Sequence, residues 1–212
     1  YVNRLGGRMS KPEKRTKAEQ REATTALLLE IAREIFTRDG YAGAATEEIV
    51  ERAGLTRGAL YHHFVNKEGL FHAVVESLQA RTAAHIETIT AQYSDPWDQL
   101  IAGSVAFLEI SLDPQIQRIM LVDAPAVLGW SVWRDMDTRH SMKSLREALA
   151  TLIDQGILPE MPLEAITHLL SGAMNEAALW IAQSDTPQAR LGEAADALKH
   201  LLQGLRLRRV AE

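Results

Sequence analysis

Residues 46–64 hold two short helical segments on either side of one glycine, and this spacing restricts the fold more than any other feature of the sequence. The segment reads TEEIVERAGLTRGALYHHF. Thr46 is expected to cap the first helix, with acidic residues favourably placed in its first turn, and Thr56 to cap the second. Gly54 supplies the turn between them. The pattern predicts a helix-turn-helix within nineteen residues.

The second helix of this motif separates inward apolar side chains from outward polar ones. The residues spaced to pack against a preceding helix are Ile49, Val50, Ala53, Leu55, Leu60 and Phe64. The residues left facing outward are Thr56, Arg57, Gly58, Tyr61 and His62. Arginine can donate two hydrogen bonds to a guanine edge, and tyrosine and histidine can reach phosphates. The alternative for Tyr61 and His62 is packing between helices, and His63 is expected to shield the core.

Helical spacing recurs along the rest of the chain, and no strand-length window alternates with period two. We therefore predict an all-α protein of about nine helices. An N-terminal three-helix domain is joined by a long helix to a C-terminal bundle for ligand binding and dimerisation. Capping residues followed by proline at 95–96, 113–114 and 186–187 mark helix starts. The expected helices span 17–39, 46–53, 56–63, 67–93, 95–111, 114–123, 126–155, 162–184 and 187–207. The first carries an apolar stripe of Leu27, Ile31, Ile35 and Phe36, and Asn66 is expected to cap the fourth.

Charge is distributed unevenly between the two parts of the chain. The formal net charge is −5, yet residues 1–67 carry 12 Lys and Arg against 9 Asp and Glu. We expect residues 1–16 to form a flexible basic arm that reaches along a phosphate backbone, or else a solvated tail. Residues 1–8 are interpreted as either a vector remnant or an extended start. The predicted domains are 17–66 for DNA binding and 67–212 for ligand binding and dimerisation.

The motif resembles the DNA-binding domain of the TetR/AcrR family of transcription regulators. The resemblance rests on Thr46, Ile49, Ala53-Gly54-Leu55, Gly58, the run Leu60-Tyr61-His62-His63-Phe64, and Lys67 with Leu70. It implies a homodimer that represses transcription and leaves a pseudo-palindromic operator when a small effector binds. Carried over to this sequence, it makes Thr46, Tyr61, His62 and Lys67 phosphate contacts, while Arg57, with Thr56 and Gly58, faces bases.

Large apolar side chains are concentrated after the long helix, where the resemblance implies an effector pocket. The predicted pocket residues are Trp97, Phe107, Met120, Trp130, Trp133, Met136, His140, Met174 and Asn175. Flat aromatic and flexible sulfur-containing groups suit a pocket for an apolar or aromatic ligand. Taken singly, each of them is better explained as an ordinary helical core residue, and it is the resemblance that favours a cavity for the set as a whole. Asp123, Asp137 and His168 are further polar candidates.

The last two predicted helices each carry a wide apolar stripe that includes small residues. Such stripes allow close helix packing, and two helices from each subunit would form a two-fold symmetric interface. The predicted interface residues are Leu169, Ala173, Ala177, Trp180, Leu191, Leu198 and Leu202. The alternative is that both helices only cover their own subunit.

Several classes of function lack support in the sequence. There is no cysteine, no apolar run long enough for a membrane span, and no signal segment, which favours a cytoplasmic protein without membrane contact. A glycine-rich phosphate loop and a nucleophile elbow are missing, and Asp137 with His140 lacks a third metal ligand at helical spacing. We therefore expect no enzyme activity, no cofactor and no metal. A DNA binder that ignores small molecules is the remaining alternative.

Overall fold

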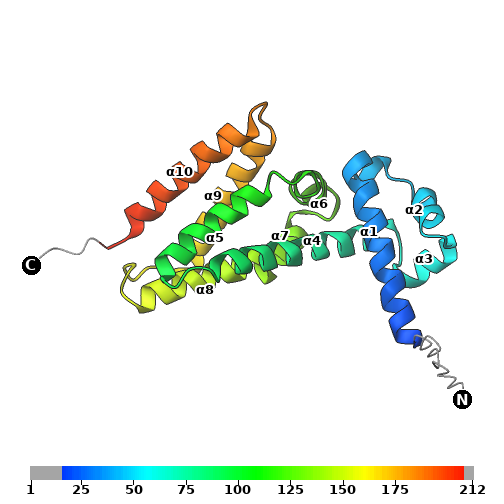
Figure 1. Cartoon of the computed structure of the whole chain (residues 1–212), viewed down its shortest axis with the longest axis horizontal. Helices are drawn as coiled ribbons and strands as arrows, with labels where there is room; N and C mark the ends of the chain where they lie inside the picture. The colour runs from blue at the N-terminus through cyan, green and yellow to red at the C-terminus, as the bar shows by residue number, and fades with distance from the viewer. Residues whose placement is uncertain (1–15, 208–212) are drawn as a thin grey trace, which may run out of the picture.

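The structure is a computed structural model that describes residues 16–207, and within that range it is entirely helical (Figure 1). This confirms the predicted fold class. The basic arm lies almost wholly outside the described residues, as do residues 208–212. The described helices are α1 (Lys17–Gly43), α2 (Thr46–Arg52), α3 (Arg57–His63), α4 (Lys67–Thr90), α5 (Pro96–Ile110), the π-helix η1 (Ile116–Asp123), α6 (Ala124–Val127), α7 (Trp130–Arg139), α8 (Ser141–Asp154), α9 (Leu163–Ala182) and α10 (Pro187–Leu205).

Helices α1, α2 and α3 pack at one end of the molecule around side chains that the sequence pattern largely predicts (Figure 1). Ile31, Ile35 and Phe36 of α1 are buried, but Leu28 is buried in place of Leu27, which is 45% exposed. The predicted stripe was therefore wrong by one position at its start.

Caps in this part of the chain follow the sequence with one exception. The Thr56 hydroxyl accepts the Ala59 amide, and the Asn66 side chain accepts the Gly69 amide, so both residues are N-caps. Thr46 does not cap α2, because it is itself the first helical residue and its side chain is buried. Gly40 interrupts α1 with a positive φ of 69°, and the helix resumes for one more turn.

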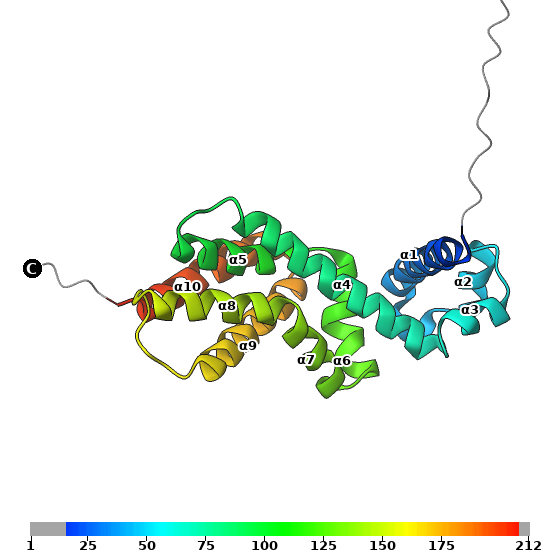
Figure 2. The same cartoon turned by 90° about the horizontal axis from the view of Figure 1, so that it is seen from below.

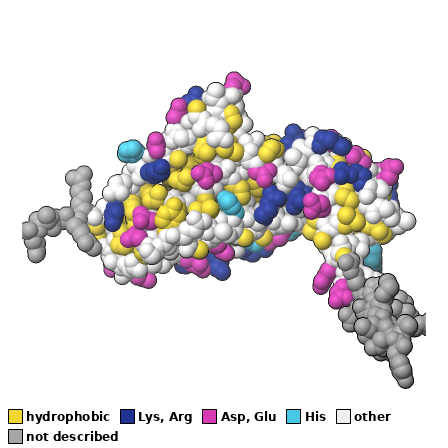
Figure 3. Space-filling model, in the orientation of Figure 1, with side chains coloured by type: hydrophobic (Ala, Val, Ile, Leu, Met, Phe, Trp, Pro, Cys, Tyr) yellow, Lys and Arg dark blue, Asp and Glu magenta, His cyan; other side chains and the backbone are white. Residues whose placement is uncertain are grey.

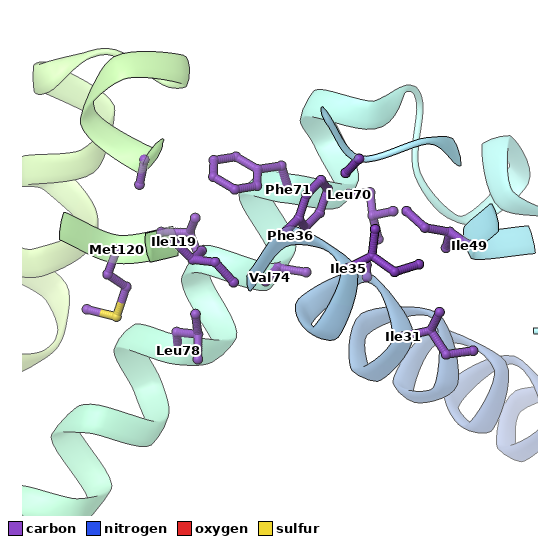
Figure 4. Packing of buried hydrophobic residues seen from close by; sticks show 14 of the residues in the cluster. Ile31, Ile35, Phe36, Ile49, Leu70, Phe71, Val74, Leu78, Ile119 and Met120 are labelled. Carbon is purple, nitrogen blue, oxygen red and sulfur yellow. The ribbon is translucent and has the colours of Figure 1, made fainter. Parts of the chain in front are cut away.

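The long helix α4 connects the two ends of the molecule (Figures 1 and 2). Its first turns give Leu70, Phe71 and Val74 to the core beneath α1, where all three are fully or almost fully buried. Figure 4 shows that this core continues without a break from Ile35 and Phe36 to Ile119 and Met120 of η1. The predicted boundary at residue 66 therefore does not separate two hydrophobic cores.

A second core lies among α5, α8, α9 and α10 at the far end of the molecule. Leu100, Leu149, Leu152, Ile181 and Leu202 are buried within it. Arg206 lies over the Trp97 ring at 4.9 Å, which covers the outer side of this core. Among the helices of residues 16–207, none is long and apolar enough to cross a membrane.

The predicted single helix 126–155 was wrong, because the chain breaks twice within it. Gly129 has a φ of 83°, which ends the short α6 and sets the start of α7. His140 separates α7 from α8 with a φ of −117° and a ψ of −106°. Its Nε2 lies 2.7 Å from Glu76 Oε1 on α4, so a contact distant in sequence stabilises this break.

Two other segments differ locally from the sequence prediction. The expected helix 114–123 is a π-helix from Ile116, entered after Asp113 accepts the Gln115 amide. Thr186 makes no side-chain cap for α10; instead, the Ser184 hydroxyl accepts the Thr186 amide. Proline at the first position of α10 is retained, as expected.

Candidate DNA-binding surface and ligand-binding cavity

Helix α3 lies at one end of the molecule, away from the bundle (Figures 1 and 2). Leu60 is fully buried and fixes its inner face, while Thr56, Arg57, Gly58 and His62 are exposed. Tyr61 is half-buried. The side chains predicted to face outward therefore share one surface of α3. No other part of the described chain covers this surface.

The Arg57 guanidinium is held in place by groups on this same surface. Arg57 Nη1 lies 2.9 Å from Glu47 Oε1, and Arg57 Nε donates a hydrogen bond of 3.3 Å to the Tyr61 hydroxyl. The contact with Tyr61 raises the pKa of Arg57, as does the charge of Glu47. The pKa of Glu47 is lowered by hydrogen bonds from its own backbone amide and from Thr46, and then by Arg57. Both side chains of the ion pair are mostly exposed, so solvent and salt weaken it.

Lys67 lies at the first position of α4, three residues after the motif ends at Phe64. Its charge acts on Glu47, near the start of the motif. Its ammonium is 4.6 Å from the centre of the Tyr41 ring, in a cation–π contact. A helix N-terminus with a lysine beside it favours an anion, and the contact of Lys67 with a phosphate stays a prediction. Thr46 is 8% exposed, and its hydroxyl donates to Glu47, so only its backbone amide can easily reach a phosphate.

His63 turns away from this surface. Its Nδ1 lies 3.0 Å from the Thr25 hydroxyl of α1, and burial, followed by the charges of Arg21 and His62, lowers its pKa. A half-buried histidine of this kind favours the neutral form. It therefore fixes α3 against α1, in keeping with the role expected from the sequence.

A cavity of about 310 Å³ lies between α4, α5, α8 and α9. Its volume is at the lower end of the range for small-molecule sites. Apolar side chains and hydroxyl groups form its wall together with three carboxylates, Glu87, Asp137 and Glu147, and the carboxamide of Gln99. The lining residues are Ile86, Glu87, Thr90, Gln99, Leu100, Gly103, Ser104, Phe107, Asp137, Ser141, Met142, Ser144, Leu145, Glu147, Ala148, Thr151, Ser171 and Met174.

Asp137 is the buried charged group of this cavity. Arg134 Nη1 donates to its Oδ2 at 2.6 Å, and the Ser171 hydroxyl donates to the same oxygen at 3.3 Å. Burial raises the pKa of Asp137, while Arg134, Ser171 and Asn175 counteract that shift. The carboxylate is therefore paired within the protein, and Arg134 does not itself line the cavity.

The structure brings together only part of the predicted ligand-binding set. Phe107 and Met174 line the large cavity, and Phe107, Met120, Trp133 and Asn175 line a smaller neighbour beneath η1. The remaining four do not line either cavity. Trp97 and Met136 are core residues, Trp130 is 65% exposed with its ring tilted against that of Trp133, and His140 contacts Glu76.

Sequence reasoning missed the hydroxyl and small side chains of the cavity wall. Ser104 and Gly103 on α5, and Ser141 and Ser144 on α8, all line it. A Cβ atom at Gly103 would lie 2.9 Å from Thr90 Cγ2, so this glycine allows α5 to approach α4 closely. Small polar residues on otherwise apolar helices were the signal available in the sequence.

The outward face of α9 and α10 exposes apolar and small residues. Leu169, Trp180 and Leu201 are 69%, 44% and 62% exposed, and Ala173 is exposed beside them. Leu198 and Leu202, however, are buried in the subunit's own core, where they are not available to a partner. On the face drawn in Figure 3, hydrophobic side chains gather over the part where Figure 1 places α5 and α10.

Helix η1 is bonded directly to the end of α1. The Asp123 carboxylate accepts the Tyr41 backbone amide at 2.7 Å and the Arg118 Nε at 3.2 Å. The Arg118 guanidinium also lies against Gly40, where a Cβ atom would come within 1.8 Å of its Nη2. Helix η1, which lines the smaller cavity, therefore makes a polar contact with α1 in addition to the apolar core.

Two family models match the chain, and together they cover both ends of the molecule. Residues 28–74 match the model for bacterial regulatory proteins of the tetR family. Residues 97–205 match the model for the C-terminal domain of tetracyclin repressor-like proteins. The first match contains α2, α3 and the start of α4, and the second contains α5 to α10.

Individual proteins show the same similarity. A crystal structure of a TetR-family transcriptional regulator from Pectobacterium atrosepticum is 40% identical, with a TM-score of 0.77, and the match covers 92% of this chain and 99% of that one. The transposon Tn10 TetC protein of Escherichia coli is 25% identical over 71% of this chain and 76% of its own length. The transcriptional repressor AcnR of Corynebacterium glutamicum is 27% identical over 70% and 76%, respectively.

Proposed function

Since this chain belongs to the TetR family of bacterial transcriptional regulators, we propose that it is a repressor that leaves its operator when a small molecule enters the cavity between α4, α5, α8 and α9. Its function as a DNA-binding regulator, and not an enzyme, follows from the family. Repression is proposed because a relative that shares most of its length is a repressor. The effector is expected to be small and mainly apolar, because the buried side chains of Leu100, Met142 and Met174 line the cavity.

The observation that carries this proposal is the uncovered surface of α3. Arg57 is exposed on the first turn of this helix, and only the weak contacts with Glu47 and Tyr61 hold it. Such a side chain can exchange these partners for the N7 and O6 of a guanine. Thr56 and Gly58, on either side of Arg57 in the sequence, are also proposed to face the bases. The proposed phosphate contacts are Tyr61, His62, Lys67 and the N-terminus of α2 at Thr46.

A homodimer is proposed through the exposed face of α9 and α10. Leu169, Ala173 and Leu201 present exposed apolar surface, and Ala177 lies at its edge. Trp180 is 44% exposed on the same face, with the Arg190 guanidinium 4.8 Å from its ring centre. Leu191, Leu198 and Leu202 support these helices from within. Two copies related by a two-fold axis would place both α3 helices toward one duplex, where half-sites recur at roughly 34 to 36 Å.

The first experiment tests DNA recognition. Selection of bound sequences from random duplexes is expected to yield a pseudo-palindrome, and Arg57→Ala is expected to weaken its binding by about 1 to 3 kcal/mol at one base position per half-site. Binding to random DNA should fall much less. Arg146→Ala serves as the control, because Arg146 is an exposed, ion-paired arginine on α8. Equal losses on selected and random DNA would remove Arg57 from base recognition.

The second experiment tests the dimer interface by sedimentation velocity. Leu169→Glu places a charge on the exposed face of α9 and is expected to give monomers that bind the operator weakly. Val122→Glu makes the same chemical change at a residue of η1 that is 50% exposed, and it should remain dimeric. A Leu169→Glu dimer of unchanged affinity would locate the interface elsewhere.

A further inference from the structure

A second, very small cavity lies beneath the π-helix η1. Its volume is about 10 Å³, and side chains from α4, α5, η1, α7 and α9 line it. Two of these residues carry a buried polar atom without a hydrogen-bond partner among the described residues: Gln79 Oε1 and Trp133 Nε1. Gln79 is 1% exposed and Trp133 is 4% exposed. Unpartnered polar atoms at such depth are costly and rare in folded proteins.

The two atoms have complementary requirements. The carbonyl oxygen of Gln79 accepts a hydrogen bond, and the indole N–H of Trp133 donates one. A hydroxyl group satisfies both at once, because its oxygen accepts while its proton is donated. The volume matches about one water-sized group, which leaves no room for a carboxamide. A carboxylate lacks the proton for Gln79, and an ammonium lacks a lone pair for Trp133.

This small cavity adjoins the large one. Phe107 and Asp137 line both cavities, so the two spaces share these side chains as part of their walls. In the large cavity, Leu100, Met142 and Met174 can contact the apolar part of a ligand. None of its described lining residues is Lys or Arg, so no cation is present to pair with an anionic ligand. Asp137 is already paired with Arg134 and disfavours an anion at the junction.

We propose that the effector is a neutral molecule with an apolar ring or chain body and one terminal hydroxyl, and that Gln79 and Trp133 bind this hydroxyl beneath η1. The proposal rests on the cavity being the effector site of the regulator. The body fills the space between α5 and α8, and the hydroxyl reaches past Phe107. A hydroxyl bound in the small cavity contacts η1, and η1 is hydrogen-bonded to α1 through Asp123. The bound group is therefore near the contact between the two ends of the molecule.

The test compares 2-naphthol with 2-methylnaphthalene, which replaces the hydroxyl by a methyl group of similar size. Calorimetry on the full chain without DNA is expected to show 2-naphthol binding at least about tenfold more tightly, since two buried hydrogen bonds distinguish the probes. The indole N–H signal of Trp133, one of four in a ¹⁵N spectrum and assigned by Trp133→Phe, should shift with 2-naphthol alone.

A variant separates hydroxyl recognition from folding. Gln79→Met removes the acceptor at similar volume, so it should reduce the preference for 2-naphthol to about twofold or less without lowering the thermal midpoint. Gln99→Met is the control, because Gln99 lines only the large cavity and the preference should persist. Equal affinity for the two probes, no binding of either, or a single water retained between Gln79 and Trp133 beside bound 2-naphthol would overturn the proposal. DNA binding is not part of these measurements, so their failure leaves operator recognition to its own test.

Discussion

At the scale of single residues, the free protein already contains a competitor for DNA. Glu47 holds Arg57 at 2.9 Å and adds a negative charge to the surface that must approach phosphates. Glu47→Gln is expected to strengthen binding to every DNA sequence severalfold at low salt, because an exposed ion pair and a repulsion are both removed.

Fluorescence anisotropy on selected and random duplexes measures this change. The matched control is Glu164→Gln, since Glu164 is 65% exposed, like Glu47, and pairs with Arg146 on the bundle. Weaker binding by Glu47→Gln would mean that the carboxylate orients Arg57 for base recognition instead of competing with DNA.

Lys67 differs from Arg57 because its position at the start of α4 suits a phosphate and carries no sequence information. Lys67→Ala should weaken binding to all duplexes and reduce the slope of log K against log salt by about 1 per subunit. The exposed Lys143 on α8 provides the control substitution. A slope equal to that of the unsubstituted protein would remove Lys67 from the phosphate contacts.

At the scale of helices, local signals in the sequence located the N-terminal half well and the middle poorly. Thr56, Asn66 and Asp95 cap the helices that they were expected to cap, because a cap depends on neighbours within three residues. The break at His140 depends on Glu76, 64 residues away, which no local pattern contains.

The candidate DNA-binding surface could be predicted from local sequence, whereas the cavity could not. The outward residues of α3 could be predicted because a short helix with one buried face leaves few alternatives. The cavity could not be predicted from aromatic content, because Trp97 became core and Trp130 became surface. A cavity is space left by packing between distant helices, and residue type alone does not encode it.

The close approach of α5 to α4 at Gly103 leads to a prediction about stability. Gly103→Ala would place a methyl group 2.9 Å from Thr90 Cγ2 and should destabilise the protein by about 1 to 3 kcal/mol. Thr90→Ser removes the opposing methyl group, so the double variant should recover most of the loss in a urea titration. Additive losses in the double variant would show that the contact with Thr90 is not the cause.

At the scale of the whole molecule, the continuous core argues that the DNA-binding end and the bundle unfold together. Phe36 and Ile49 of the DNA-binding end belong to the same buried cluster as Ile119 of η1 and Trp133 of α7. The four tryptophans lie on α5, α7 and α9, so their fluorescence reports on the bundle and, at Trp133, on the shared core, whereas far-UV circular dichroism reports on every helix. Urea unfolding curves from the two probes, measured at one fixed protein concentration, should therefore coincide.

The same coupling predicts an effect across the molecule. Ile49→Ala leaves a cavity in the core beneath α2 and should lower the free energy of unfolding by about 2 to 5 kcal/mol. The urea midpoint followed by tryptophan fluorescence should shift as much as the midpoint followed by circular dichroism. Val65→Ala, at a residue 88% exposed, should move neither curve. Loss of dichroism ahead of the fluorescence change would mean that the first three helices open on their own. The contact of η1 with α1 could not then transmit effector binding by rigid packing, and transmission would have to depend on local unfolding of the DNA-binding helices.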